Sequence, residues 1–227
     1  MNTVSRFLAD LVFPNRCPCC DDFIRWDKLI CGKCHRSIET VYEKACPVCG
    51  LETCICSEEN FCDRSLVPLR YETLVKEGVL SLKRGNNKNF GEYAGKLIAG
   101  ILKNEMPELE FDMIMPVPMS PASFRKRGFN QAEIIAGEIA AALDIPLVTD
   151  VLIKLDTDSS QHYLNKSQRM RNITSIKIKE TDLTGKRIII CDDVITTGST
   201  INRCARLLKN SGAETVFAAA AAGTKLR

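Results

Sequence analysis

Beyond residue 62, the apolar positions of the chain switch repeatedly between two spacings. Short apolar runs predict buried strands, and apolar residues three or four positions apart predict helices that bury one face. The predicted strands cover residues 65–71, 113–117, 147–155, 187–191 and 215–220. The predicted helices cover residues 75–85, 93–102, 132–143 and 200–209. Because strands that alternate with helices pair in parallel, we expect an α/β fold: an open parallel sheet with helices on both faces.

The cysteines divide the chain into two parts. Ten of the 12 cysteines lie at or before residue 62. We therefore expect residues 1–62 to form a helix and a small cysteine-rich module, and residues 63–227 to form the α/β domain. The apolar stretch near the N-terminus is interrupted by Arg6 and Asp10, which is typical of a docked helix rather than an export signal. In the reducing cytoplasm, where we expect the protein to stay, metal binding explains the cysteines better than disulfides do.

Two pairs of cysteines with the same spacing predict a first zinc site. Cys17 and Cys20 form one pair, and Cys31 and Cys34 form the other. Each pair can form a knuckle that points two sulfurs at one ion. Two knuckles then complete a tetrahedral four-thiolate site.

A second zinc site is predicted around Cys46 and Cys49, which repeat this spacing. Two further ligands must come from Cys54, Cys56 and Cys62, whose spacing is irregular, and we assign Cys54 and Cys62.

Both zinc sites are expected to be structural. Four thiolates leave no open position for catalysis, and a segment this short needs metal to fold. Cys19 and His35 lie beside ligands in the sequence and are not expected to bind the ion.

The sharpest motif follows the apolar strand at residues 187–191, where Asp192 and Asp193 precede a loop of small hydroxyl residues and one glycine. The loop residues are Thr196, Thr197, Gly198, Ser199 and Thr200. Backbone N–H groups at the start of the next helix can hold a phosphate together with the loop hydroxyls. Carboxylates accept hydrogen bonds from sugar hydroxyls. The alternative is a solvated surface turn, but such a turn does not need a buried strand, paired acids, a hydroxyl-rich loop and a helix start together. We therefore predict a site for a phosphorylated sugar.

A basic segment follows the strand at residues 113–117 and precedes the helix at residues 132–143. Ligands of open α/β sheets bind beyond the carboxyl ends of the strands, so this segment is expected near the acidic pair. Basic side chains and an exposed helix start can bind a diphosphate, and a solvated basic turn is the alternative. The residues expected at the diphosphate are Lys83, Arg84, Arg127, Gly128, Asn130 and Gln131.

The segment with the two aspartates resembles the motif that binds phosphoribosyl pyrophosphate (PRPP) in type I phosphoribosyltransferases. Pro-Val-Pro at residues 116–118 and Arg-Gly-Phe-Asn-Gln at residues 127–131, behind a cysteine-rich zinc module, make nearly the whole chain similar to the ComF family. The resemblance implies that PRPP binds with Mg²⁺. Asp192 and Asp193 would contact the ribose, the loop the 5-phosphate and Arg127 the diphosphate; these two acids and Arg127 would be the catalytic groups of an enzyme.

Residues 154–172 resemble the hood loop that closes over the ligand in ComF proteins. The hood residues implied by this resemblance are Lys154, Gln161 and Arg169. Lys154 stands where the family has an arginine, and lysine lacks the planar fork needed for a bidentate contact.

The resemblance implies a part in DNA uptake during natural transformation, with single-stranded DNA and competence proteins as partners. A net charge of +3 and an aromatic content of 6% do not indicate nucleic-acid binding by themselves. One alternative is an active phosphoribosyltransferase of nucleotide salvage or metabolism, whose acceptor the sequence leaves open. Another is an adaptor whose zinc knuckles contact proteins. Membrane insertion is not expected, because no apolar run is long enough to cross a bilayer.

Overall fold

The computed structural model describes residues 13–56, 59–85, 87–156 and 175–225. The helix predicted near the N-terminus lies almost wholly outside these ranges, and the hood residues Gln161 and Arg169 lie outside them too. Among the described residues, no helix is both long and apolar enough to cross a membrane.

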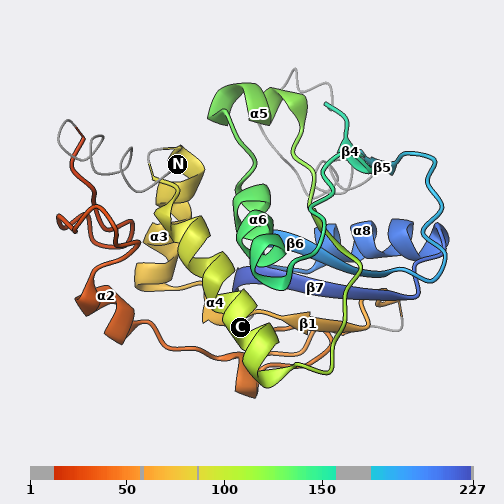
Figure 1. The fold of residues 1–227 in the computed structure, drawn as a ribbon, viewed down its shortest axis with the longest axis horizontal. Coiled ribbons are helices and arrows are strands. Elements are labelled where there is room, and N and C mark those ends of the chain that lie inside the picture. The colour runs from red at the N-terminus through yellow and green to blue at the C-terminus, as the bar shows by residue number, and fades with distance from the viewer. Residues whose placement is uncertain (1–12, 57–58, 86, 157–174, 226–227) are drawn as a thin grey trace.

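A five-stranded parallel sheet forms the centre of the molecule (Figure 1). Its strands are β1 (Arg64–Leu66), β2 (Leu69–Arg70), β3 (Met113–Pro116), β6 (Arg187–Ile195) and β7 (Thr215–Gly223). The strand order is β1-β7-β6-β3, and β2 continues the line of β1 along β7. Every pairing in this sheet is parallel, as the alternating pattern predicted.

Helices cover both faces of the sheet, which confirms the predicted layers. On one face lie α3 (Thr73–Arg84), α4 (Asn89–Glu105) and α6 (Gln131–Leu143), and on the other lies α8 (Ser199–Asn210). In Figure 1, α4 and α6 lie in front of the sheet and α8 lies behind it.

The side chains of β6 alternate between these two layers. Ile189 and Cys191 belong to the apolar cluster with α3, α4 and α6, whereas Ile188 and Ile190 belong to the cluster with α8. A strand buried on both sides needs an uninterrupted apolar run, and residues 188–191 supply one. The acidic pair that follows these residues therefore lies toward the carboxyl end of a strand that is packed on both faces.

The strand predicted at residues 147–155 behaves differently. Only β4 (Leu152–Lys154) is a strand, and it pairs antiparallel with β5 (Ile176–Ile178) in a separate two-stranded sheet. Leu152 and Ile176 pack in the cluster with α8, so this hairpin buries its apolar side against that helix instead of extending the main sheet. Leu147 alone makes a parallel bridge to the edge strand β3.

The first strand is shorter than predicted, and one helix was not predicted. Residues 65–71 form β1 and β2 with a break that contains Pro68, because proline has no N–H to give to the ladder. The short helix α5 (Pro121–Arg127) begins at Ser120, whose hydroxyl accepts a hydrogen bond from the Ser123 N–H.

The cysteine-rich module contains α2 (Gly32–Ser37) and a 3₁₀ turn, η1 (Tyr42–Lys44), and it packs onto the α/β domain at two places. Cys17 and Cys34 belong to the apolar cluster on the α4 face, and Leu51 belongs to the cluster on the α8 face. The division of the chain at residue 62 stays a prediction.

Candidate functional site

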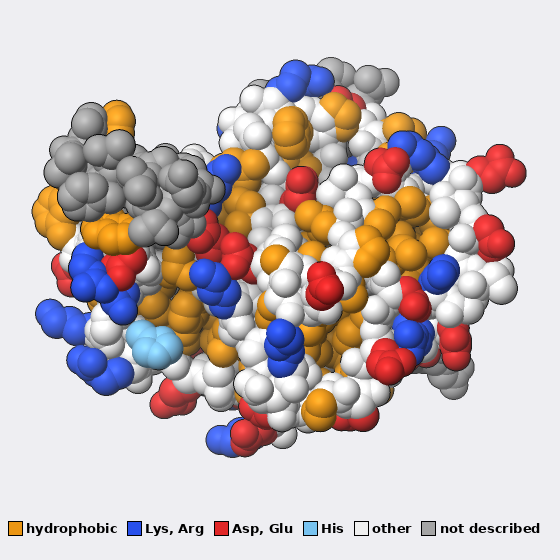
Figure 2. All heavy atoms as spheres, viewed as in Figure 1, with side chains coloured by type: hydrophobic (Ala, Val, Ile, Leu, Met, Phe, Trp, Pro, Cys, Tyr) orange, Lys and Arg blue, Asp and Glu red, His pale blue; other side chains and the backbone are white. Residues whose placement is uncertain are grey.

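A polar cleft of about 290 Å³ opens at the carboxyl ends of β3 and β6. The charged and amide side chains that line it come from α3, α5, α6, β4 and β6: Lys83, Arg127, Asn130, Gln131, Lys154, Asp192 and Asp193. Figure 2 shows the surface indented beside the lobe that carries α5. Residues from distant parts of the sequence thus meet where ligands of this fold class bind.

Asp192 and Asp193 lie near the end of β6, which pairs with β7 as far as Ile195. The Asp193 N–H donates a hydrogen bond to Asp192 Oδ1 at 2.8 Å. Asp193 Oδ2 lies 3.0 Å from Lys83 Nζ, so a lysine of the cleft neutralises this carboxylate. Burial raises the pKa of the Asp192 carboxyl to about 7, and the neighbouring charge of Asp193 adds to the increase. At neutral pH, Asp192 is therefore partly protonated and Asp193 is paired with a lysine.

The hydroxyl loop lines a second, smaller hollow of about 30 Å³ at the start of α8. Gly198 is the N-cap of this helix and has a φ of 69°, a left-handed conformation that suits glycine. Thr197 Oγ1 and Ser199 Oγ lie 2.9 Å apart. Asp192 and Thr200 line both hollows, so the loop and the carboxylates lie next to each other.

Gln131, which lines the cleft, has a buried donor without a partner among the described residues. Its side chain is 2% exposed, and its Oε1 accepts a hydrogen bond from Arg127 Nη1 at 3.1 Å. Its buried Nε2 has no hydrogen-bond partner among the described residues. A buried donor left without a partner costs about 1–3 kcal/mol, which an oxygen of a ligand in the cleft would relieve.

Asn130 fixes the start of α6 beside Gln131. Its Oδ1 accepts a hydrogen bond from the Ala132 N–H, and its Nδ2 donates to the Val117 carbonyl at 2.9 Å. The side chain thus caps the helix and ties it to the segment after β3. The helix start predicted after the basic segment is therefore present, at residue 131.

Two residues expected at the diphosphate lie elsewhere. Arg84 lines a different hollow beside the first cysteine group, because successive residues of α3 point in directions about 100° apart. Gly128 ends α5 with a φ of 80° and is not among the residues that line the cleft. Of the three consecutive basic residues, only Arg127 lines the cleft, and Arg125 pairs with Asp156 at 3.4 Å.

Sequence reasoning missed the cleft residues of the segment that links β3 to α5. Met119, Ser120 and Ser123 line the cleft together with the predicted residues. The Ser-Pro sequence at residues 120–121 is a helix-start signal that would have revealed α5 and placed these hydroxyls.

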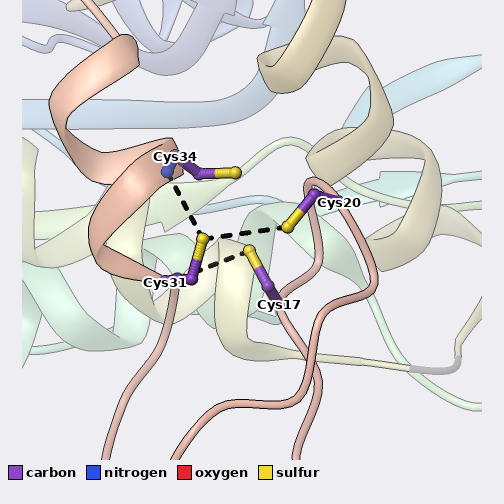
Figure 3. A group of neighbouring side chains, drawn as sticks. All are labelled: Cys17, Cys20, Cys31 and Cys34. Atoms are coloured by element: carbon purple, nitrogen blue, oxygen red, sulfur yellow. Dashed lines mark hydrogen bonds between the residues drawn. The ribbon is translucent and has the colours of Figure 1, made fainter.

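The first cysteine group has the predicted composition. The sulfurs of Cys17, Cys20, Cys31 and Cys34 all lie within 4.8 Å of one another. In Figure 3, the sulfurs of Cys17, Cys20 and Cys31 gather around one point at the start of α2, with that of Cys34 beside them. Four sulfurs at this separation fit the tetrahedral shell of a structural zinc ion.

The second cysteine group corrects one predicted ligand. It consists of Cys46, Cys49, Cys54 and Cys56, so Cys56 takes the place predicted for Cys62. The Cys62 side chain is buried in the cluster on the α8 face, and burial raises the pKa of its thiol to about 12. Cys54 and Cys56 are separated by one residue, and both sulfurs can still reach one ion. The spacing of the three candidate cysteines differs from that of a knuckle, so the sequence did not show which two belong to the group.

Comparison with known proteins finds two domain families that match parts of the chain. Residues 129–225 match the phosphoribosyl transferase domain, and residues 8–66 match the double zinc ribbon domain. Together with the strand order, these matches define a type I phosphoribosyltransferase-like protein with an N-terminal double zinc ribbon.

Three relatives are similar to this chain. Competence protein F of Haemophilus influenzae is 31% identical over 108 residues, which are 46% of this chain and 47% of that protein. DNA utilization protein YhgH of Escherichia coli O157:H7 is 32% identical over 105 residues, 46% of each chain. Competence protein ComFC of Streptococcus pneumoniae is 28% identical over 204 residues, 84% of this chain and 86% of that protein. The chain spans about half the length of the first two relatives. The chain is similar to competence proteins of the ComF type in both its N-terminal module and its α/β domain.

Proposed function

We propose that the protein binds PRPP, with Mg²⁺, in the cleft at the carboxyl ends of β3 and β6. One observation carries the proposal: the acidic pair and the hydroxyl loop share one site with Arg127 and Gln131. PRPP carries a phosphate on one side of its ribose and a diphosphate on the other. Its site therefore needs hydrogen-bond acceptors for the ribose hydroxyls, placed between donors for the phosphate and donors for the diphosphate. The cleft offers this arrangement.

Each part of the site suits one part of the ligand. Asp192 and Asp193 accept hydrogen bonds from the ribose hydroxyls. The N–H groups at the start of α8 and the hydroxyls of residues 196–200 bind the 5-phosphate, which the helix dipole also favours. Arg127 and Gln131 donate to the diphosphate. When bound, Mg²⁺ neutralises charge on the diphosphate oxygens.

Isothermal titration calorimetry with PRPP and Mg²⁺ tests this proposal. We expect saturable binding to the intact protein and no measurable binding to the variant with Asp192→Asn and Asp193→Asn. Asp150→Asn, an exposed aspartate outside the cleft, is the matched control and should bind as tightly as the intact protein. Absence of heat with the intact protein, or unchanged affinity of the double variant, would rule the site out.

We propose further that this PRPP site serves the handling of incoming DNA in natural transformation. The support is the names of the relatives, two competence proteins and a DNA utilization protein. Deletion of the gene in a transformable host should lower the transformation frequency, and complementation with the Asp192 and Asp193 double variant should fail to restore it. Full restoration by that variant would separate PRPP binding from transformation.

Direct contact with single-stranded DNA is a separate part of this proposal. Basic residues of α5 that precede Arg127 in the sequence, Arg125 and Lys126, would track the phosphate backbone. Affinity for a fluorescent single strand should then fall steeply as ionic strength rises. Binding that is absent or independent of salt would reject the contact.

A catalytic role is the second candidate, and the position of Arg127 and Gln131 favours it. Transfer breaks the bond between the ribose C1 and the diphosphate oxygen, the electron pair leaves with pyrophosphate, and an acceptor bonds to C1. Donors at the leaving group stabilise the charge that develops there. Pyrophosphate release should therefore be measured against bases, amines and nucleic acids. Release with any acceptor that Arg127→Ala abolishes would establish catalysis, and a blank screen would leave binding as the function.

A further inference from the structure

The second cysteine group lies beside the hydroxyl loop at residues 196–200, here called the phosphate loop because the proposed function places the 5-phosphate in it. A hollow of about 180 Å³ is lined on one side by Cys49, Ile55 and Cys56 and on the other by residues 197–199 and Asn202. The cysteine-rich module and the phosphate loop therefore face each other across this hollow.

Asn202 joins the two sides through three hydrogen bonds. Its Oδ1 accepts a bond from the Phe61 N–H at 2.7 Å, and its Nδ2 donates to the Glu59 carbonyl at 2.8 Å. Its backbone N–H donates to the Gly198 carbonyl at 2.8 Å, in the first turn of α8. One residue thus links the segment that follows Cys56 to the glycine of the phosphate loop.

An apolar contact adds to this link. A Cβ atom built on Gly198 would lie 3.7 Å from Ile55 Cδ1, so Ile55 lies within van der Waals reach of the loop. Ile55 stands between two cysteines of the second group, and its position depends on how those cysteines are held.

The other half of the cysteine group is fixed to the sheet. Ser65 in β1 donates through its hydroxyl to the Val48 carbonyl at 2.6 Å, and its N–H donates to the Pro47 carbonyl at 2.7 Å. The knuckle at residues 46–49 is therefore anchored without metal. Because a zinc ion would bind Cys54 and Cys56 to this anchored knuckle, it would also fix Ile55 and the segment that Asn202 contacts.

We propose that the second cysteine group, when it holds zinc, positions the phosphate loop through Asn202 and Ile55 and so raises the affinity for the 5-phosphate. Asn202 is a positioning residue, separated from the ligand by the loop. The proposal rests on the proposed function, since it concerns the same PRPP site. It predicts that the two cysteine groups differ: only the second controls ligand binding.

Two matched cysteine variants test this difference. Cys56 and Cys20 are both exposed members of four-cysteine groups, one beside the loop and one remote from it. Cys56→Ser should weaken PRPP binding about tenfold, in the range found when outer contacts of a site are removed, while Cys20→Ser leaves it within about twofold. Equal effects of the two variants, or none from Cys56→Ser, would overturn the proposal.

Asn202→Leu tests the link without touching a cysteine, and Asn210→Leu at the far end of α8 is its control. Asn202→Leu should keep both zinc equivalents and lose about fivefold in PRPP affinity, the effect of about 1 kcal/mol in hydrogen bonding. Unchanged affinity with zinc retained would overturn the role of Asn202, even if Cys56→Ser fails to fold.

Hydrogen exchange separates failure of this proposal from failure of PRPP binding. Without ligand, backbone amides of residues 200–205 should exchange about tenfold faster in Cys56→Ser and Asn202→Leu than in Cys20→Ser. Faster exchange in a protein that does not bind PRPP would support the coupling and reject the ligand. Tight PRPP binding with unchanged exchange and affinity in both variants would reject the coupling alone.

Discussion

At the scale of single residues, the two aspartates at the end of β6 have different partners and different charge states. Asp193 is paired with Lys83, and Asp192 has a pKa raised to about 7 by burial and by the charge of Asp193. Two carboxylates side by side at a sheet edge oppose folding, because one must be protonated or desolvated. Adjacent carboxylates that oppose folding are typical of functional sites.

This charge state predicts how stability changes with pH. An unfolded Asp192 loses its proton near pH 4, whereas the folded carboxyl keeps it up to about pH 7. The folded state binds more protons within this window, so its stability falls as pH rises and the loss is complete above the folded pKa. Asp192→Asn should therefore raise the free energy of unfolding by about 1–3 kcal/mol at pH 8 and by less at pH 5. Urea unfolding at the two pH values measures this, and a loss of stability at pH 8 would contradict it.

At the scale of elements, α4 and α6 approach each other closely at a glycine. A Cβ atom on Gly95 would lie 2.7 Å from the Ile135 carbonyl oxygen and 2.6 Å from Glu138 Cβ, both on α6. This contact fixes the position of α6. The N-cap of this helix, Asn130, and its first residue, Gln131, line the cleft. The close approach therefore helps to place Gln131 in the wall of the cleft.

Two substitutions in the same helix test this contact. Gly95→Ala should destabilise the protein by about 1–3 kcal/mol, because the α6 backbone must move. Gly100→Ala, where a Cβ meets nothing within 4 Å, should stabilise it by about 0.5–1 kcal/mol through helix propensity. Chemical unfolding of the two variants measures the difference, and equal stabilities would show that α4 and α6 tolerate separation.

Local patterns predicted the elements but not every contact between them. Residues 187–191 and the buried face of α8 were evident, because an apolar strand and helical spacing are local signals. The pairing of β4 with β5 was not, since partner choice depends on what α8 covers. The ion pair of Lys83 and Asp193 likewise joins α3 to β6, and no spacing in the sequence shows it. Long-range packing decided each of these.

At the scale of the whole molecule, the two cysteine groups serve different parts of the domain. The first packs with the cluster on the α4 face, and the second lies by the hydroxyl loop at residues 196–200 on the other side of the sheet. The double zinc ribbon is thus part of the packed structure around the site.

Metal content tests the composition of the second group. The intact protein should hold two zinc equivalents, Cys62→Ser should keep two, and Cys56→Ser should keep about one, because only Cys56 belongs to the group. Elemental analysis of freshly purified protein gives these values. Loss of an equivalent in Cys62→Ser, with Cys56→Ser unaffected, would restore the ligand set expected from sequence.

The most direct test of the PRPP site is the structure of the protein crystallised with PRPP and Mg²⁺. We predict ribose hydroxyls within hydrogen-bond distance of Asp192 and Asp193, the 5-phosphate in the loop at residues 196–200 and the diphosphate beside Arg127 and Gln131. Density for the ligand outside this cleft, or in it with the phosphate end at Arg127, would contradict the assignment.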